Sequence, residues 1–135
     1  MTTELHFPVL TAILTGLLWI PVVIGYVSSR GVLRPADYKA APTKQLPDWV
    51  ARANRAHLNA VENLAPFAVV VLVAQAIGFS TPLTRFCAVT YFCARLAHAL
   101  IHISRFARFK ARTLAFSVGL AAFITFAIMW FWHAT

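Results

Sequence analysis

The sequence predicts an all-α integral membrane protein, a bundle of four transmembrane helices that forms a single domain over residues 1–135. Composition is the first reason, because 60% of the residues are hydrophobic and only 12% are charged. Four long apolar stretches are the second reason, since about 18 or more apolar residues in a row are typical of a membrane-spanning helix. In lipid, backbone polar groups must be hydrogen-bonded within the protein, so helices joined by short links are expected.

The first two predicted spans cover residues 8–29 and 48–78. The first contains no charged residue, and the segment before it has no lysine or arginine, which is unlike a secretory signal. We interpret it as a retained transmembrane helix with a candidate kink at Pro21. At the start of the second span, Asp48 directly follows Pro47 and is a candidate N-cap.

The third and fourth predicted spans cover residues 83–104 and 113–132. The turn before the third span, residues 78–82, is short and contains Gly, Ser, Thr and Pro. The fourth span has no charged residue. It ends with Trp130 and Trp132, and tryptophan is enriched where a helix leaves the membrane.

Basic residues are concentrated in two of the links. The chain has twelve Lys and Arg against four Asp and Glu, a net charge of +8. The link after the first span holds Arg30, Arg34, Lys39 and Lys44. The link before the fourth span holds Arg105, Arg108, Lys110 and Arg112. Between the second and third spans only Arg85 occurs, and the two tails have no lysine or arginine.

This asymmetry orients the chain. By the positive-inside rule both basic links are cytoplasmic and both termini lie on the noncytoplasmic side, as expected for a protein of the cell inner membrane. Because the charges sit beside apolar spans, topology and anionic lipid explain them better than nucleic-acid binding, and no nucleic-acid partner is expected.

A stripe of polar residues runs along the beginning of the second span. At 100° per residue, its members share a helix face about 80° wide: Arg52, Arg55, Asn59 and Glu62. Asn63 lies at the edge of this face and His57 points to roughly the opposite side. Four residues beyond Glu62, Pro66 removes a backbone donor and bends the helix. This proline is either an ordinary transmembrane proline or a kink that opens a cavity beside the stripe.

A second stripe with the same spacing lies in the third span and consists of Arg95, His98, His102 and Arg105. Taken singly, its arginines could snorkel to the interface and His98 could be an interior histidine. Taken together, the two stripes indicate a site, because ionisable groups within membrane helices are rare and usually mark function. His98 and His102 have a spacing that suits a metal, but no third ligand accompanies them, so no metal is expected.

The residues of the second span also carry a family resemblance. The pattern R-x-x-R-A-H-x-N-x-x-E-x-x-x-P resembles the second-helix signature of the MAPEG family, and here it comprises Arg52, Arg55, Ala56, His57, Asn59, Glu62 and Pro66. These are membrane-associated proteins of eicosanoid and glutathione metabolism, including microsomal glutathione transferases and prostaglandin E synthase. Arg95 and His98 resemble the family's third helix. Chain length, four spans and orientation agree, so the resemblance covers nearly the whole chain.

The resemblance implies a homotrimer that binds glutathione between neighbouring subunits, toward the cytoplasmic side. The glutathione-binding candidates that it implies are Arg55, Asn59, Glu62, Arg95, His98 and His102. Arg112 and Thr113, with one inserted residue allowed, match an arginine and a serine near the thiol and are the catalytic candidates. Three positions depart from the family pattern: Leu58 stands where members can have an arginine, and His102 and Phe116 stand where tyrosines are found.

The sequence therefore predicts a glutathione-dependent transferase or peroxidase that acts on an apolar electrophile. Arginines bind carboxylates, Glu62 can bind the amine of glutathione, and Arg112 can lower the pKa of its thiol. One alternative is a noncatalytic protein of the same fold that binds lipids or other lipophilic molecules. Another is a small transporter that uses Glu62 as a proton-coupled site, although the arginines of the stripe disfavour a cation path.

The predicted topology can be tested by cysteine labelling. Single cysteines placed at Thr2 or Ala134, in a background without Cys87 and Cys93, should react with a membrane-impermeant thiol reagent from the noncytoplasmic side. The opposite orientation is disfavoured, because the lysines and arginines of the two basic links would then have to cross the membrane. Labelling of either tail from the cytoplasm would contradict the topology.

Overall fold

The structure, a computed structural model, describes residues 2–32, 34–35, 45–104 and 109–134. These residues form α-helices and contain no β-strand. Four helical segments are long and apolar enough to cross a membrane: Thr3–Arg30, Asp48–Ala76, Pro82–Ile103 and Lys110–His133. The prediction of an all-α bundle of four membrane helices is thus confirmed, and the chain is an integral membrane protein.

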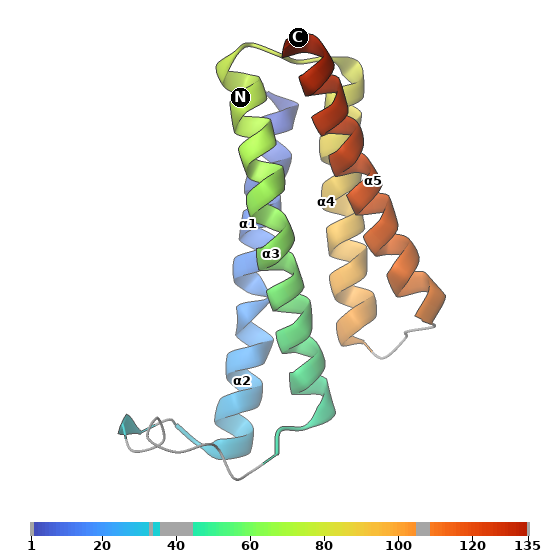
Figure 1. The fold of residues 1–135 in the computed structure, drawn as a ribbon. Helices are drawn as coiled ribbons and strands as arrows, with labels where there is room; N and C mark the ends of the chain where they lie inside the picture. The colour runs from blue at the N-terminus through green and yellow to red at the C-terminus, as the bar shows by residue number, and fades with distance from the viewer. Residues whose placement is uncertain (1, 33, 36–44, 105–108, 135) are drawn as a thin grey trace.

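The four spans lie side by side, with α4 in contact with α1, α3 and α5 (Figure 1). In chain order the helices are α1 (Thr3–Leu17), α2 (Trp19–Arg30), α3 (Asp48–Ala76), α4 (Pro82–Ile103) and α5 (Phe109–Ala134). The start of α1, the end of α5 and the α3–α4 turn lie at one end of the bundle (Figure 1). The end of α2, the start of α3, the end of α4 and the start of α5 lie toward the other end, and the two basic links of the sequence connect these helix ends. Four of the basic residues in these links lie outside the described residues: Lys39, Lys44, Arg105 and Arg108.

The first span is interrupted at Leu18, between α1 and α2. Pro21 has no N–H to donate to the carbonyl of Leu17, so the interruption falls where the proline weakens the helix. At the same level His57 of α3 reaches the first span, where its Nδ1 donates to the carbonyl of Thr15 at 3.1 Å. Its ring also packs against Trp19, with centroids 5.2 Å apart. As expected, His57 therefore points away from the polar stripe of its own helix.

The start of α3 differs from the expectation that Asp48 is the N-cap. Pro47 occupies that position, and its carbonyl accepts hydrogen bonds from the backbone N–H groups of Val50 and Ala51 at 2.9 and 3.3 Å. Asp48 is already helical and no side chain caps this end. The fixed φ of proline favours an extended residue directly before the helix, which moves the boundary one residue earlier. Asp48 still lies in the first turn, where its charge complements the helix dipole.

Glu4 of α1 is completely buried at the end of the bundle that holds the termini, where it connects neighbouring helices. Its Oε1 accepts hydrogen bonds from Ser80 Oγ at 2.7 Å and Thr84 Oγ1 at 2.9 Å, and Arg85 Nε lies 3.8 Å away. Thr84 also forms a capping box with Thr81 at the start of α4. These contacts tie the beginning of α1 to the α3–α4 turn.

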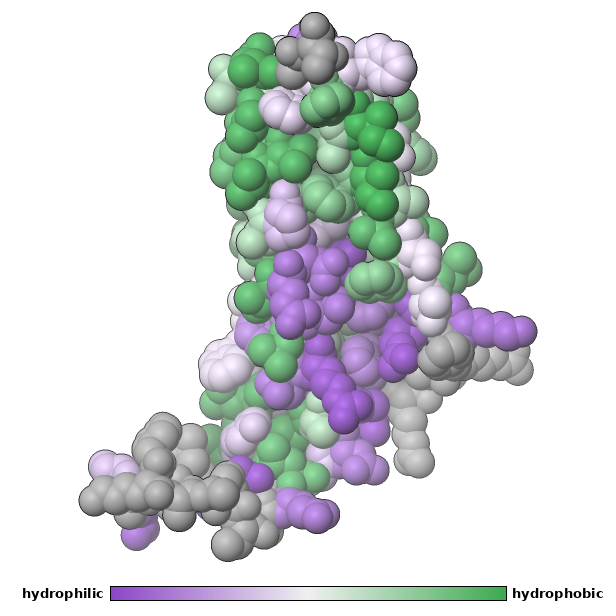
Figure 2. All heavy atoms as spheres, viewed as in Figure 1, coloured by the Kyte–Doolittle hydropathy of each residue, from purple (hydrophilic) through white to green (hydrophobic). Residues whose placement is uncertain are grey.

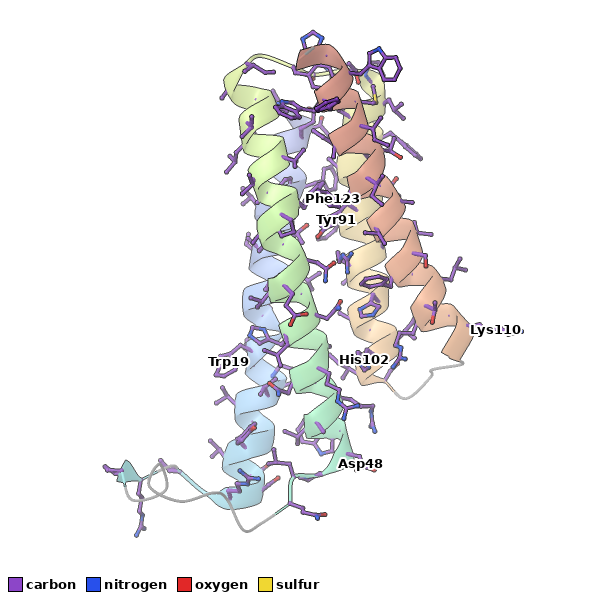
Figure 3. All side chains as sticks on the ribbon, in the orientation of Figure 1. Trp19, Asp48, Tyr91, His102, Lys110 and Phe123 are labelled. Atoms are coloured by element: carbon purple, nitrogen blue, oxygen red, sulfur yellow. The ribbon has the colours of Figure 1, made fainter. Side chains whose placement is uncertain are left out.

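An aromatic cluster fills the centre of the bundle. Phe67 of α3 stacks on Tyr91 of α4, with ring centroids 3.7 Å apart, and meets Phe123 and Phe126 of α5 edge-on. Phe67, Tyr91 and Phe126 are among the most deeply buried side chains. Figure 3 shows Tyr91 and Phe123 between the helices, with His102 nearer the basic links. The aromatic cluster therefore lies between the half of the bundle that holds Glu4 and the half that carries the polar stripes.

Candidate functional site

A pocket of about 460 Å³ opens between α3, α4 and α5, in the half of the bundle near the basic links. Pockets for small molecules usually measure roughly 300–1,000 Å³, so it is large enough for such a ligand. Its lining consists of Arg55, Leu58, Asn59, Glu62, His98, His102, Arg112, Thr113 and Phe116. Figure 2 shows the corresponding concentration of hydrophilic residues, below a surface that is mostly hydrophobic.

The predicted site residues come together around this pocket. Seven of them line it, namely Arg55, Asn59, Glu62, His98, His102, Arg112 and Thr113. Arg95 lies behind the lining and reaches it through Asn59. Of the other stripe residues, Arg52 is not among the lining residues and Arg105 lies outside the described residues.

The α3 wall presents one polar face. Arg55 and Glu62, two helical turns apart, are both exposed, while Asn59 between them is half-buried. The carbonyl of Asn59 accepts a hydrogen bond from Asn63 Nδ2 at 2.8 Å, and its Oδ1 accepts one from Arg95 at 3.3 Å. The charged groups of Arg55 and Glu62 thus lie at the open side of the pocket. The amide of Asn59, hydrogen-bonded to Arg95, lies deeper.

Arg95 of α4 is the most buried cation beside the pocket, with 4% of its surface exposed. Its guanidinium lies over the rings of Tyr91 and Phe116, at 5.0 and 5.1 Å from their centroids. Its Nε is buried and has no hydrogen-bond partner among the described residues. Within the part of the chain that the structure describes, no carboxylate lies at ion-pair distance from Arg95. Within the described residues, the positive charge is therefore held by two aromatic faces and one amide oxygen.

Gly119 of α5 makes room for this guanidinium. A Cβ at this position would lie 3.3 Å from both Nε and one terminal nitrogen of Arg95, which is closer than side chains usually approach. An alanine at this position would require the guanidinium to shift by a few tenths of an ångström. The fourth span therefore contributes a glycine to the site as well as its lining side chains.

The remaining wall combines two histidines of α4 with the first turns of α5. The rings of His98 and His102 meet edge to face, with centroids 5.7 Å apart, and His98 also lies 5.9 Å from the ring of Phe116. Arg112 and Thr113 complete this wall. Imidazole, guanidinium and hydroxyl groups therefore lie together on the side of the pocket that faces α3.

Pro66 leaves α3 helical on both sides, so the helix is not broken beside the pocket. The proline nevertheless removes the backbone donor for the carbonyl of Glu62. At the adjacent carbonyl, of Asn63, Tyr91 donates a hydrogen bond from its hydroxyl at 2.6 Å. Tyr91 therefore supports both Arg95 and the α3 backbone at the inner end of the pocket.

A second, shallower recess of about 320 Å³ lies on α5 and is lined by Lys110, Thr113, Leu114 and Ser117. Thr113 belongs to both recesses. The polar pocket and the α5 recess therefore adjoin at Thr113. The recess combines the apolar side chain of Leu114 with polar side chains.

The charges around the polar pocket define the ligand that would fit it. Three guanidinium groups, of Arg55, Arg95 and Arg112, are combined with one carboxylate, of Glu62. Arginines favour carboxylates and phosphates through paired hydrogen bonds, and a carboxylate favours an ammonium group. A ligand with more than one anionic group and one amine matches this arrangement. Among the described residues, no three His, Cys, Asp or Glu side chains gather as a metal site would require.

The sequence analysis missed Tyr91 and Gly119. The family resemblance had singled out Leu58 and Phe116 as departures, and both line the pocket. Tyr91 precedes Arg95 by four residues, so helical spacing could have placed it on the same face. Gly119 and Phe116 belong to a span without charges, and nothing in its sequence separates site residues from residues that face lipid.

Comparison with known proteins identifies a family. The model of a protein family described as the MAPEG family matches residues 7–132. The match extends over nearly the whole chain and includes every residue that lines the polar pocket. Among curated proteins, none matches the chain.

Proposed function

The chain belongs to the MAPEG family, and from this premise we propose that it binds glutathione in the polar pocket and uses the thiol against an apolar electrophile. Membership by itself supports a membrane protein of glutathione-related or eicosanoid metabolism. The observation that carries the more specific proposal is the pocket's charge, three guanidinium groups against one carboxylate. A transferase or peroxidase reaction is the activity that these groups support best.

Glutathione matches the pocket group by group. It has two carboxylates, one amine and one thiol, and therefore carries more negative than positive charge at neutral pH. Arg55 can bind a carboxylate at the open side of the pocket, and Glu62 can bind the amine through a charge-assisted hydrogen bond. Arg95 acts from behind Asn59 and holds the deeper part of the pocket positive. On the opposite wall, the buried His98 can form a hydrogen bond to glutathione.

The thiol is assigned to the wall formed by Arg112 and Thr113. Only the thiolate is a good nucleophile, and a nearby positive charge lowers the pKa of a thiol. Arg112 would stabilise the thiolate, and the hydroxyl of Thr113 would donate a hydrogen bond to it. The α5 recess on the other side of Thr113 offers a place for the electrophile, with Leu114 as its apolar contact. An apolar molecule can enter this recess directly from the lipid.

A noncatalytic lipid-binding role remains the second candidate, because two apolar side chains line the pocket. Leu58 is 48% exposed there, and Phe116 brings a ring without a hydroxyl. Such a protein would bind lipophilic molecules without consuming glutathione. Measurable conjugation or peroxide reduction with glutathione separates the two candidates.

We further infer that the protein is a homotrimer whose neighbouring subunits cover the open side of the pocket. Apolar residues of α3 close to Arg55 and Glu62 in the sequence are exposed, among them Leu58 at 48% and Val61 at 45%. Arg55 and Glu62 are exposed on the same helix, so a neighbouring subunit can complete the ligand's surroundings.

Native mass spectrometry tests this assembly. Protein released from a gentle detergent should give a trimer as the main species, because the exposed face of α3 would then be buried between subunits. Detection of monomers and dimers alone, under conditions that preserve a known membrane trimer, would contradict it.

The polar stripe of α3 generates a test of glutathione binding. Arg55→Ala and Glu62→Ala should each weaken binding about tenfold to a hundredfold, since a charge-assisted hydrogen bond contributes roughly 1.5–3 kcal/mol. Calorimetry in detergent measures the affinity, and circular dichroism checks that each variant is folded. His57→Ala is the control on the same helix, because His57 contacts Thr15 and Trp19 and does not line the pocket. It should lower stability more than affinity. Equal losses of affinity at His57 and Arg55, in folded protein, would show that the stripe is not the binding face.

Arg112 should behave differently from the stripe. If it stabilises the reacting thiolate, Arg112→Ala should lower kcat sharply and change the dissociation constant of glutathione little. Arg112→Lys is the matched variant, because it keeps the charge without the planar guanidinium and should retain part of the turnover. A loss of binding with unchanged kcat would instead make Arg112 a ligand for a carboxylate.

A further inference from the structure

His102 lines the polar pocket and has no role in the binding of glutathione proposed above. It lies near the end of α4 that adjoins the basic link, on the side of the helix that faces the pocket (Figure 3). Its ring is half-buried, in contrast to the buried ring of His98 one turn earlier. This partly open imidazole lines the same pocket as Arg112 and Thr113, the residues to which the proposed function assigns the thiol.

We propose that His102 is a catalytic residue that accepts the thiol proton of bound glutathione and returns it to the product of the reaction. This inference rests on the proposed function and adds the general base that Arg112 and Thr113 do not provide. A guanidinium stays protonated in proteins, and a hydroxyl is a poor proton acceptor near neutral pH. Neutral imidazole is the side chain best suited to this transfer near neutrality.

The other proton acceptors of the pocket are less suited. Glu62 stands on α3, among the residues assigned to the amine of glutathione. His98 is 7% exposed and is enclosed by Phe116 and by His102 itself. His102 is therefore the imidazole of this wall with the most open approach from the pocket.

The charged groups around His102 come from all three helices of the pocket. Arg112 of α5 and Arg55 and Arg52 of α3 interact with it electrostatically. His98 faces it from α4, and Glu62 belongs to the α3 lining. Transfer of a proton from the thiol to the imidazole leaves the total charge of the pocket unchanged. The arginines disfavour an imidazolium by like-charge repulsion, but the new imidazolium gains the thiolate as a counter-ion, and Arg112 stabilises the same thiolate.

The complete step is balanced within the pocket. The S–H bond breaks and an imidazole N–H bond forms, which leaves a thiolate beside Arg112. The sulfur then forms a bond to the electrophilic atom, and the leaving group departs with the electron pair of the bond that breaks. The imidazolium of His102 donates its proton to that leaving group and regains its neutral form. Glutathione and the electrophile of the proposed function are the only reactants.

The test compares His102→Gln with the unmutated protein. Glutamine keeps hydrogen-bonding capacity but cannot accept the proton. We expect the ultraviolet absorbance of bound thiolate to develop at a higher pH in the variant, and turnover at neutral pH to fall on the order of a hundredfold or more. The affinity for glutathione, measured by calorimetry, should change far less. His6→Gln is the control, because His6 is exposed at the opposite end of the bundle and should leave both readouts unchanged.

Chemical rescue provides an independent readout. In His102→Ala, added free imidazole should restore part of the turnover, whereas a purely structural role for His102 would give no rescue. A variant that binds glutathione and forms thiolate over the same pH range as the unmutated protein would overturn the inference, and so would the absence of rescue in a glutathione-binding His102→Ala protein. Failure of the unmutated protein to bind glutathione would instead overturn the proposed function itself, and this inference with it.

Discussion

The polar half of this bundle depends on one buried cation, the guanidinium of Arg95. It is held by two aromatic faces, from α4 and α5, and by an amide oxygen of α3. Gly119 of α5 leaves the space that it occupies. A buried charge is costly in a protein surrounded by lipid, so helices that contribute to its support are fixed relative to each other. Under the proposed function, this positive charge favours an anionic ligand in the adjoining pocket.

Tyr91 connects this cation to the rest of the fold. Its ring stacks on Phe67 in the aromatic cluster, its face supports Arg95, and its hydroxyl binds a carbonyl of α3 beside the carbonyl that Pro66 leaves without a donor. The apolar packing of one half and the polar site of the other are therefore coupled through a single side chain. This coupling explains how a membrane bundle with few charged residues can hold several of them in a defined arrangement.

Hydropathy and helical spacing were sufficient to predict the fold class, the four spans and the two polar stripes. These features depend on periodicity within one helix, which the sequence contains. Arg95 lies behind the pocket lining, and Gly119 and Phe116 adjoin it from α5. These placements depend on how α4 packs against α5, and the periodicity of a uniformly apolar span does not encode that packing. The prediction that Asp48 is the N-cap was wrong for a local reason. Pro47 and Asp48 both favour the start of a helix, and the fixed conformation of the proline places the N-cap at Pro47.

The most direct test of the central claim, that this pocket is an anion site for glutathione, is calorimetric titration of the purified, unmutated protein in detergent. Saturable binding of glutathione is predicted, with an affinity that falls as salt concentration rises and falls further for the diester of glutathione, whose carboxylates carry no charge. Absence of saturable binding in protein that is shown to be folded, or equal affinity for the diester, would contradict the assignment of the arginines around the pocket to a carboxylate-bearing ligand.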